Sequence, residues 1–480
     1  MSPRPQTRAE REAALHELDV RLQRDPLAID VELDRARLLA ELDRPDEARD
    51  SYLRLVARNP GHLRALNDFG TFLMQGGFRA AARTVYERAL ALAPQSALAH
   101  ANLAHVLFAD GDYAAAQRHY EAALAIDPQH APAHQGLSYT LTRLGLDDAA
   151  LLHRQLGFAG RALTTAPYRG AAPPVDVLLC VCAGGGTLYT DTFLDDRIFR
   201  TTTLVADLYD GTPAPPPVDV VFNAISDADR AAGALTAVER LLAGTTRPVI
   251  NTPARVRATA RAANAARLAA LPGVVAPRIV TVDLGVLRAR GAALIAEHGF
   301  AFPLLVRAPG FHTGEHFARV ERAADLAAAV AAFPGPDALL IEYVDVRGDD
   351  ERVRKYRVLA VDGALYPLHV AVATTWKVHY FSADMVADAA NRAEDERFLA
   401  DPAGTIGAPA WSALERIRDC LGLEYAGIDF GIDRAGRVVV FEANATMIVL
   451  PPAAEGIWDY RRAPVERIIT AVRAMLIARR

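Results

Sequence analysis

The chain has 480 residues, of which 51% are hydrophobic and 23% charged, and its formal net charge at pH 7 is −5. This composition is typical of well-packed globular domains, about three at the usual domain size, and it argues against bulk disorder. The small negative charge excludes the basic footprint expected of a protein whose main partner is duplex nucleic acid.

The N-terminal residues and the cysteines bear on location. Residues 1–12 are polar, and no apolar run reaches about 18 residues, so we expect neither a signal peptide nor a membrane partner, and we expect a cytoplasmic protein. Cys180, Cys182 and Cys420 are interpreted as small buried hydrophobes, because no second Cys or His pair has metal-ligand spacing.

The first third of the chain is repetitive. Prolines recur every 34 residues, and small residues and a tyrosine recur at matching positions between them: Pro26, Pro60, Pro94, Pro128; Ala36, Gly70, Ala104; Ala48, Ala82, Ala116; Tyr52, Tyr86, Tyr120. This pattern resembles the tetratricopeptide repeat, a helix-turn-helix unit. The resemblance implies an all-α solenoid over residues 1–165, capped by a degenerate helix pair at 131–161, with a concave surface for a protein or peptide partner. A helical packing domain that binds nothing remains the alternative.

A linker of Pro and small residues, 167–174, precedes an α/β segment. The segment is predicted to contain strands at 175–182, 218–224 and 248–251 and a helix at 229–243. This alternation predicts a parallel sheet with helices on its faces. The glycines within 183–187 are interpreted either as an anion-binding loop or as a tight turn.

A hairpin near the C-terminus carries the strongest functional signal. The apolar run around Asp429, the Asp-Arg-Ala-Gly turn at 433–436 and the apolar run 437–441 predict two antiparallel strands. Glu442 and Asn444 end the second strand two residues apart, so they share one face, and Asp429 is on the partner strand. Two carboxylates and an amide oxygen predict a Mg²⁺ site, since Mg²⁺ takes few protein oxygens and leaves its other positions to phosphate and water. Solvated residues at a strand end are the alternative.

This hairpin resembles the metal-binding hairpin of the ATP-grasp superfamily, most of all the branch of glutathione synthetase and the ribosomal S6 modification glutamate ligase. The resemblance covers roughly Val175 to Pro452. It implies a pre-ATP-grasp α/β domain at 175–255 and α+β ATP-grasp lobes at 256–337 and 338–480. ATP and Mg²⁺ are the implied cofactors, and Asp429, Glu442 and Asn444 are the implied metal ligands.

The resemblance also implies nucleotide-binding residues. Arg261, on a helix expected at 255–270, and Arg307, at the end of a strand, stand where the family has phosphate-binding lysines. Residues 338–345 resemble the hinge between the lobes. There Glu342, Tyr343 and Val344 are expected to bind adenine, and Asp345 to bind the ribose.

Lys355 and Lys377 are the only lysines in the chain, and both fall in the region of the implied active site. The stretch from Lys355 to Gly363 resembles a glutathione synthetase hairpin in which the arginine, here Arg357, acts on the phosphate. His369 and Lys377 occupy a region where the family has an arginine. His369 is interpreted as a substrate contact or a buried structural histidine, and Lys377 as a buried functional cation beside Trp376.

A lid over the phosphates is expected at 312–316. His312, Glu315 and His316 make it either a polar lid or a metal-binding segment. The role of His379 is left open.

The function that these features imply is an ATP-dependent carboxylate–amine ligase that forms ADP and an acyl phosphate. Its substrates would be a small-molecule or peptide carboxylate and an amine. Arg357, Lys377 and His369 would act in catalysis, and Arg261, Arg307 and Lys355 would bind the nucleotide. Two alternatives remain: a repeat scaffold whose ATP-grasp fold is not catalytic, and a different ATP-grasp reaction such as phosphotransfer to a histidine.

Overall fold

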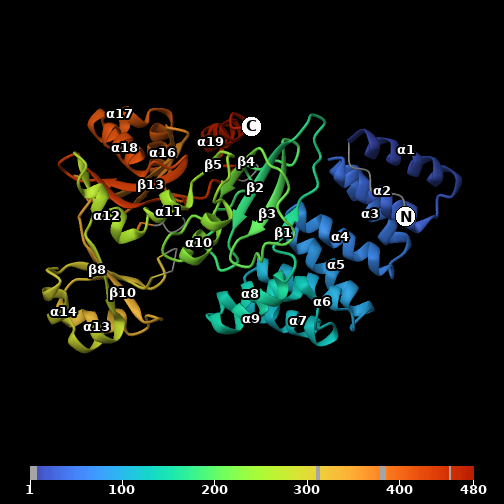
Figure 1. Ribbon diagram of the computed structural model, residues 1–480, viewed down its shortest axis with the longest axis horizontal. Helices are drawn as coiled ribbons and strands as arrows, with labels where there is room; N and C mark the ends of the chain where they lie inside the picture. Colours follow the sequence, from blue (N-terminus) through green and yellow to red (C-terminus); the bar gives the residue numbers. More distant parts are fainter. Residues whose placement is uncertain (1–7, 310–313, 379–384, 453–455) are drawn as a thin grey trace. The chain divides into compact units, whose positions relative to one another are not determined.

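The computed structural model describes residues 8–309, 314–378, 385–452 and 456–480, and its ribbon is drawn in Figure 1. The chain divides into two compact units. Unit 1 comprises Met1–Asp176 and Asp196–Pro216, and unit 2 comprises Val177–Asp195 and Pro217–Arg480.

Unit 1 is dominated by antiparallel helix pairs, drawn in blue to teal in Figure 1. The helices are α1 (Arg8–Arg24), α2 (Ile29–Glu41), α3 (Pro45–Arg58), α4 (Leu63–Gln75), α5 (Arg79–Leu92), α6 (Ala97–Ala109), α7 (Tyr113–Ile126), α8 (Ala131–Arg143) and α9 (Asp147–Phe158). Consecutive helices from α2 to α9 pack in pairs, and Tyr52, Tyr86 and Tyr120 are buried in their core. The 34-residue period expected from the sequence is therefore a period of helix pairs.

Two short strands complete unit 1. β1 (Leu163–Thr165) pairs antiparallel with β3 (Phe199–Val205), and the hydroxyls of Thr165 and Thr202 lie 2.9 Å apart. The sequence analysis did not predict β3, although its run of threonines is typical of a strand.

The first part of unit 2 is a parallel sheet, as expected. β2 (Val175–Val181) pairs with β4 (Val220–Asn223), and β4 pairs with β5 (Val249–Ile250). Helix α10 (Ala232–Leu241) lies between β4 and β5 in the chain, and α11 (Pro253–Arg257) and α12 (Arg261–Ala269) follow β5. The single helix predicted over 255–270 is wrong, because extended backbone at Ala260 (ψ 133°) separates α11 from α12. Arg261 is thereby placed at the first position of a helix.

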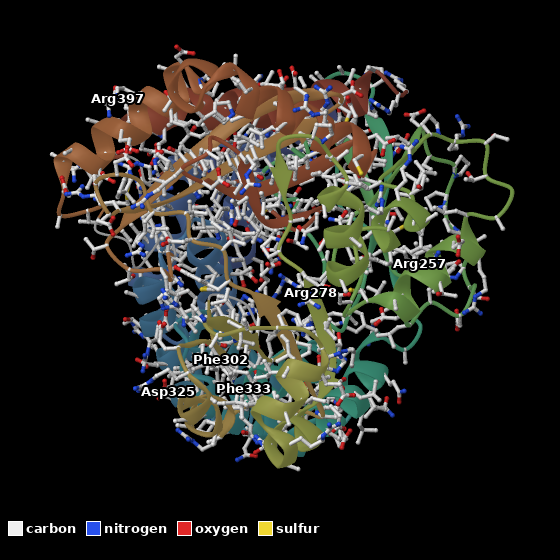
Figure 2. All side chains as sticks on the ribbon, turned by 90° about the vertical axis from the view of Figure 1, so that its left-hand side faces the viewer. Arg257, Arg278, Phe302, Asp325, Phe333 and Arg397 are labelled. Atoms are coloured by element: carbon white, nitrogen blue, oxygen red, sulfur yellow. The ribbon has the colours of Figure 1, made fainter. Side chains whose placement is uncertain are left out.

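The next part is a small lobe, an antiparallel sheet with helices against it. The strand order is β7-β10-β8-β9, with β7 (Ile279–Asp283), β8 (Leu304–Arg307), β9 (Phe317–Val320) and β10 (Asp337–Glu342). Its helices are α13 (Leu284–Arg290), α14 (Ala292–Glu297), the 3₁₀ turn η1 (Ala323–Asp325) and α15 (Leu326–Val330). Phe302 and Phe333 lie near each other within this lobe in Figure 2, and Arg278 lies towards its edge.

The last part contains the large sheet, with strand order β12-β11-β13-β14-β6. Its strands are β6 (Val274–Val275), β11 (Val353–Val361), β12 (Ala364–Ala373), β13 (Tyr425–Ile432) and β14 (Val438–Asn444). The helices around it are α16 (Ala389–Ala400), α17 (Pro402–Ile406), α18 (Ala408–Leu421), the 3₁₀ turn η2 (Asp459–Arg461) and α19 (Arg462–Ile477). β13 and β14 form the hairpin predicted from the sequence, with Asp433 capping its turn through the N–H groups of Ala435 and Arg437.

Candidate functional site

A cavity of about 830 Å³ lies within unit 2, walled by the small lobe, the large sheet and α12. Twelve of the thirteen site residues predicted from the sequence line this cavity: Arg261, Arg307, Glu342, Tyr343, Val344, Lys355, Arg357, His369, Lys377, Asp429, Glu442 and Asn444. Residues up to 183 positions apart in the sequence are thus brought together around one space.

Four of these side chains form a row across neighbouring strands of the large sheet. His369 on β12 pairs with Arg357 on β11, Arg357 pairs with Asp429 on β13, and Asp429 pairs with Glu442 on β14. Strands are about 4.8 Å apart, so the row spans roughly 14 Å. Each carboxylate has a cation beside it: Arg357 of the row pairs with Asp429, and Arg261 on α12 pairs with Glu442.

Asp429 is the most enclosed member of the row, with 1% of its side chain exposed. Arg357 donates to both carboxylate oxygens, at 2.6 and 2.8 Å, and the ammonium of Lys355 lies 2.6 Å from Oδ2. Burial by itself raises the pKa of Asp429, but Lys355 and Arg357 more than reverse this effect and hold the pKa well below its ordinary value. The carboxylate is therefore ionised and fully paired.

Glu442 and Asn444 are linked side chain to side chain. Asn444 Nδ2 donates to Glu442 Oε1 at 3.0 Å, and Arg261 Nη2 donates to the same oxygen at 3.0 Å. Thr446 donates both its N–H and its hydroxyl to Asn444 Oδ1. Burial raises the pKa of Glu442, whereas Arg261 lowers it, and the net effect is a pKa below the ordinary value.

Arg307 ends β8 and faces the cavity from the small lobe. Burial, followed by the charge of Arg261, lowers its pKa to about 10, and its guanidinium lies 5.6 Å from the ring centre of Phe317. Two arginines close enough for the charge of Arg261 to lower the pKa of Arg307 favour an anion between them. Asp227 and Asp229 also line the cavity near α12, and Asp229 accepts the backbone N–H of Arg261 at 3.2 Å.

The residues expected to bind adenine are the last residue of β10, Glu342, and the two residues that follow it. Tyr343 is held by Arg319, whose guanidinium lies 4.0 Å from the ring centre and donates to the hydroxyl at 3.0 Å. Asp345, predicted to bind the ribose, does not line the cavity; it is exposed and engages Arg347, with side-chain contacts of 2.6 to 3.0 Å. Arg347 therefore binds the carboxylate that was predicted to bind the ribose of the nucleotide.

Lys377 differs from the prediction of a buried cation, because it is exposed. Its ammonium donates to the backbone carbonyl of Gly314 at 2.6 Å, and that of Phe317 lies 3.4 Å away. Lys377 therefore connects Gly314 of the expected lid, and Phe317 just after it, to the segment that follows β12, and both partners are neutral carbonyl oxygens. His316 packs edge-on against Phe333 in the small lobe, whereas His312 and His379 lie outside the described residues.

His369 is 9% exposed. Burial lowers its pKa well below the ordinary value, and the charges of Arg357 and Arg461 lower it further. The imidazole is consequently neutral near pH 7. This burial fits both readings of His369 made from the sequence.

The sequence analysis missed Asn264, which lines the cavity on α12. Its Nδ2 donates to the carbonyl of Ala443 at 2.7 Å, but its Oδ1 is buried and has no hydrogen-bond partner among the described residues. Asn264 follows Arg261 by three positions, which places both on one face of a helix, and this spacing was the signal available in the sequence. An orphaned buried acceptor beside Glu442 and Asn444 fits a ligand that brings a donor or a cation.

The glycines of 183–187 form a turn and do not line the cavity. Gly185 and Gly186 have φ of 89° and 90°, and the carbonyl of Gly186 accepts the N–H of Ser226 at 2.8 Å. Cys180 and Cys182 are buried as expected, and Cys420 is partly buried.

Three family models match the first third of the chain, and all three describe a tetratricopeptide repeat, at residues 33–97, 85–118 and 107–152. Residues 33–152 are therefore tetratricopeptide repeats, as predicted, and repeats of this kind provide surfaces for protein or peptide partners. Comparison with curated proteins gives no match.

Comparison with solved structures gives matches that cover about a third of the chain. They include a MamA fragment from Desulfovibrio magneticus RS-1 (23% identity, 30% of this chain and 82% of that one, TM-score 0.28), PilW, titled a type IV pilus biogenesis factor (23%, 32% and 70%, 0.30), and pilF of Pseudomonas aeruginosa (22%, 31% and 68%, 0.30). No helix in the described part of the chain is both long and apolar enough to cross a membrane.

Proposed function

We propose that the C-terminal part of the chain is an ATP-grasp ligase, which uses ATP to join a carboxylate to an amine, and that the tetratricopeptide repeats recruit its protein or peptide partner. The observation that carries this proposal is that three sets of residues line one cavity. They are the oxygen-bearing residues of the β13–β14 hairpin, the cations expected to bind phosphate, and the residues at the end of β10 that are expected to bind adenine. In the proposal, 175–255 is the pre-ATP-grasp domain. The lobes, predicted at 256–337 and 338–480, differ from these bounds by two strands, because β6 belongs to the large sheet and β10 to the small lobe.

The donor set of the hairpin suits magnesium. Asp429, Glu442 and Asn444 offer carboxylate and amide oxygens, which Mg²⁺ prefers, and Asn264 adds an unpartnered amide oxygen. Oε2 of Glu442 also has no hydrogen-bond partner among the described side chains. These residues would hold Mg²⁺, which would neutralise charge on the phosphates.

The reaction needs two steps and no side-chain nucleophile. A carboxylate oxygen attacks the γ-phosphorus of ATP, the bond to the bridging oxygen breaks, and ADP leaves. The amine then attacks the acyl carbon, the carbon–oxygen bond to the phosphate breaks, and inorganic phosphate leaves. Arg261, Arg307 and Lys355 would bind the phosphates, and Arg357 would stabilise the transferred group.

Two further residues would assist. His369, which lines the cavity, would contact the substrate, and the proton that the attacking amine loses would leave with the phosphate. Lys377 would hold the lid end over the phosphates. Asp345 has no role in the proposal, because it does not line the cavity.

Thermal unfolding with and without Mg²⁺-ATP tests the nucleotide site. A ligand at 100 times its dissociation constant stabilises a protein by about 2.7 kcal/mol. We expect a Mg²⁺-dependent rise in the unfolding temperature of the wild type, a smaller rise or none for Glu442→Gln, and a full rise for the exposed control Glu466→Gln. ADP and phosphate released with a pair of acid and amine, rather than AMP, would then identify the reaction.

One observation favours a second candidate, a repeat scaffold whose ATP-grasp fold is not catalytic. Lys355, Arg357 and Arg261 already neutralise Asp429 and Glu442, and a metal ion would have to compete with them. Unfolding temperatures that ATP and Mg²⁺ leave unchanged in all three proteins would support this candidate.

A further inference from the structure

The cavity differs chemically between its two ends, and the order of strands in the large sheet separates them. At the β14 end lie Arg261, Glu442 and Asn444, the polar groups described above. At the opposite, β12 end five large apolar side chains line the cavity beside His369 and Arg461: Leu368, Ile448, Leu450, Trp458 and Val465. The ATP and metal of the proposed function account for the polar end and leave the apolar end unexplained.

A β-bulge aims two consecutive residues of β12 into the cavity. Arg357 pairs with His369 and Val358 pairs with Pro367, so Leu368 is the extra residue. Consecutive strand residues normally point to opposite faces, whereas here Leu368 and His369 both line the cavity. Bulges of this kind occur beside active sites because they redirect a side chain.

The segment after β14 supplies most of the apolar wall. Its residue Met447 lies over Gly427 of β13. Two residues on, the carbonyl of Val449 accepts the hydroxyl of Thr192, and the carbonyl of Thr192 accepts a hydrogen bond from Arg473 of α19, a helix that packs against β11 and β12. Ile448 and Leu450 line the cavity while 46% and 57% exposed. Large apolar side chains exposed together on a concave wall are typical of a binding surface.

Arg461, the cation at this end, already has a carboxylate partner. Arg461 donates through Nε to the buried Asp395 at 2.7 Å, and Tyr460 donates its hydroxyl to the same carboxylate at 2.6 Å. The guanidinium of Arg461 also lies 4.6 Å from the ring centre of Trp458. The apolar end therefore does not call for an ion of its own.

Arg357 on β11, the strand next to β12, is a suitable cation for the anionic group of a ligand. Arg357 uses Nε and Nη2 on Asp429, and its Nη1 has no hydrogen-bond partner in the described part of the chain. A carboxylate at Nη1 would sit in the row between His369 and Asp429. A chain extending from that carboxylate towards β12 would lie over Leu368 and the apolar wall.

We propose that the β12 end binds the apolar group of a hydrophobic carboxylic acid, whose carboxylate contacts Arg357 and whose chain packs on Leu368, Ile448, Leu450 and Trp458. This inference rests on the proposed ligase function and names the class of its acid substrate. A small, polar acid would leave the apolar wall in water.

Calorimetric titration with straight-chain acids from butyrate to octanoate tests the proposal, with Mg²⁺ and a non-hydrolysable ATP analogue present and, separately, absent. Each methylene that becomes buried is expected to tighten binding about 4-fold. Straight-chain amines of matched length are expected to show no such trend, because Arg357 repels an ammonium group. Acids that all bind equally, or a trend in amines alone, would overturn the proposal.

Two exposed isoleucines provide matched variants. Ile448 is 46% exposed on the cavity wall, and Ile477 is 44% exposed at the end of α19, away from the lining. Ile448→Asn, alone or with Leu450→Asn, is expected to flatten the trend with chain length, and Ile477→Asn to leave it unchanged. Equal trends in both variants would contradict the assigned wall.

The same samples separate the two proposals, because nucleotide binding is followed independently by thermal unfolding. Nucleotide binding with no dependence on acid chain length would overturn the apolar subsite and leave the ligase intact. A dependence on chain length without nucleotide binding would support the apolar subsite and count against the ligase.

Discussion

Arg357 and Asp429 face each other across neighbouring strands and form a two-point ion pair inside unit 2, with Nε–Oδ1 and Nη2–Oδ2 distances of 2.6 and 2.8 Å. Asp429 is the only carboxylate partner of both Arg357 and Lys355 among the described residues. The pair joins β11 to β13 within the large sheet, and both of its members line the cavity, so a change in either residue is expected to affect both stability and ligand binding.

Asp429→Asn is expected to destabilise the protein and to abolish Mg²⁺-dependent binding of ATP. The amide keeps the size of the side chain but leaves two cations without a counter-charge, and breaking a buried pair in this way costs about 3–5 kcal/mol. Urea unfolding gives the change in free energy, and titration with ATP gives the change in affinity.

Asp345→Asn is the matched control, since Asp345 also binds an arginine at two points but on the surface. Exposed pairs contribute little, so both stability and ATP affinity are expected to stay near the wild-type values. A loss of ATP affinity in Asp345→Asn would restore the ribose-binding role predicted from the sequence.

The local patterns of the sequence predict the repeats and the hairpin well, for a physical reason. A 34-residue period and an Asp-Arg-Ala-Gly turn each act over a short stretch, and the turn sets the register of β13 and β14 as far as Phe430 and Val440. Beyond that point a bulge at Phe441 shifts the register by one residue and brings Asp429 opposite Glu442. The approach of Asp429, Glu442 and Arg357 to one another depends on this bulge and on the order of the strands, neither of which was predicted from the sequence.

Features that depend on distant packing were not predictable. The bulge at Leu368 and the break before Arg261 have no marker in the local sequence, and the orphaned oxygen of Asn264 depends on Ala443, 179 residues away. Lys377 looked buried beside Trp376 in the sequence, but its partners are backbone carbonyls, which no pattern of side chains reveals.

Asn251 is expected to be essential for joining the parallel sheet of unit 2 to the large sheet. It is 1% exposed, its Nδ2 donates to the carbonyl of Tyr425 at 2.8 Å, and its Oδ1 accepts the N–H of Tyr425 at 3.0 Å. Asn251→Asp replaces the donor with an acceptor facing a carbonyl, and we expect a loss of about 1–3 kcal/mol or more in urea unfolding.

Asn251→Gly separates the side-chain bonds from the backbone conformation. The φ of Asn251 is +55°, which glycine adopts without strain. Glycine still removes both bonds to Tyr425, so this variant is also expected to be less stable than the wild type. Wild-type stability in Asn251→Gly would show that the two bonds contribute nothing.

Gly70 is predicted to be irreplaceable in the repeats. A Cβ built at this position would lie 2.3 Å from Cε1 of Tyr86, so Gly70→Ala forces helices α4 and α5 apart. Overpacking of this kind costs about 1–3 kcal/mol, against a gain of about 1 kcal/mol in helix propensity. Hydrogen exchange in α4 and α5 is expected to rise. Gly61→Ala, which meets no atom within 4 Å, should leave exchange unchanged.

Two histidine pairs, one repeat apart, are expected to make the repeats sensitive to acid. Nδ1 of His100 lies 3.0 Å from Nδ1 of His119, and the equivalent atoms of His134 and His153 lie 2.8 Å apart. Nε2 of His100 and of His134 contacts a backbone carbonyl, which only accepts. Each Nε2 therefore carries hydrogen, and in the neutral pair the partner histidine donates the bond between the rings.

Burial lowers the pKa of His119 and of His153 below the ordinary 6.5, and the neighbouring histidine lowers each further; Arg118 adds to the effect on His119, whereas Glu121 opposes it on His153. Below about pH 6.5 the unfolded chain therefore binds protons that the folded chain does not, so the free energy of unfolding falls as the pH falls. We expect the urea midpoint, followed by far-ultraviolet circular dichroism, to drop between pH 7 and pH 5. The double variant His119→Gln, His153→Gln should flatten this dependence, whereas the exposed His105→Gln should keep it; equal slopes in the two variants would rule out the histidine pairs as its source.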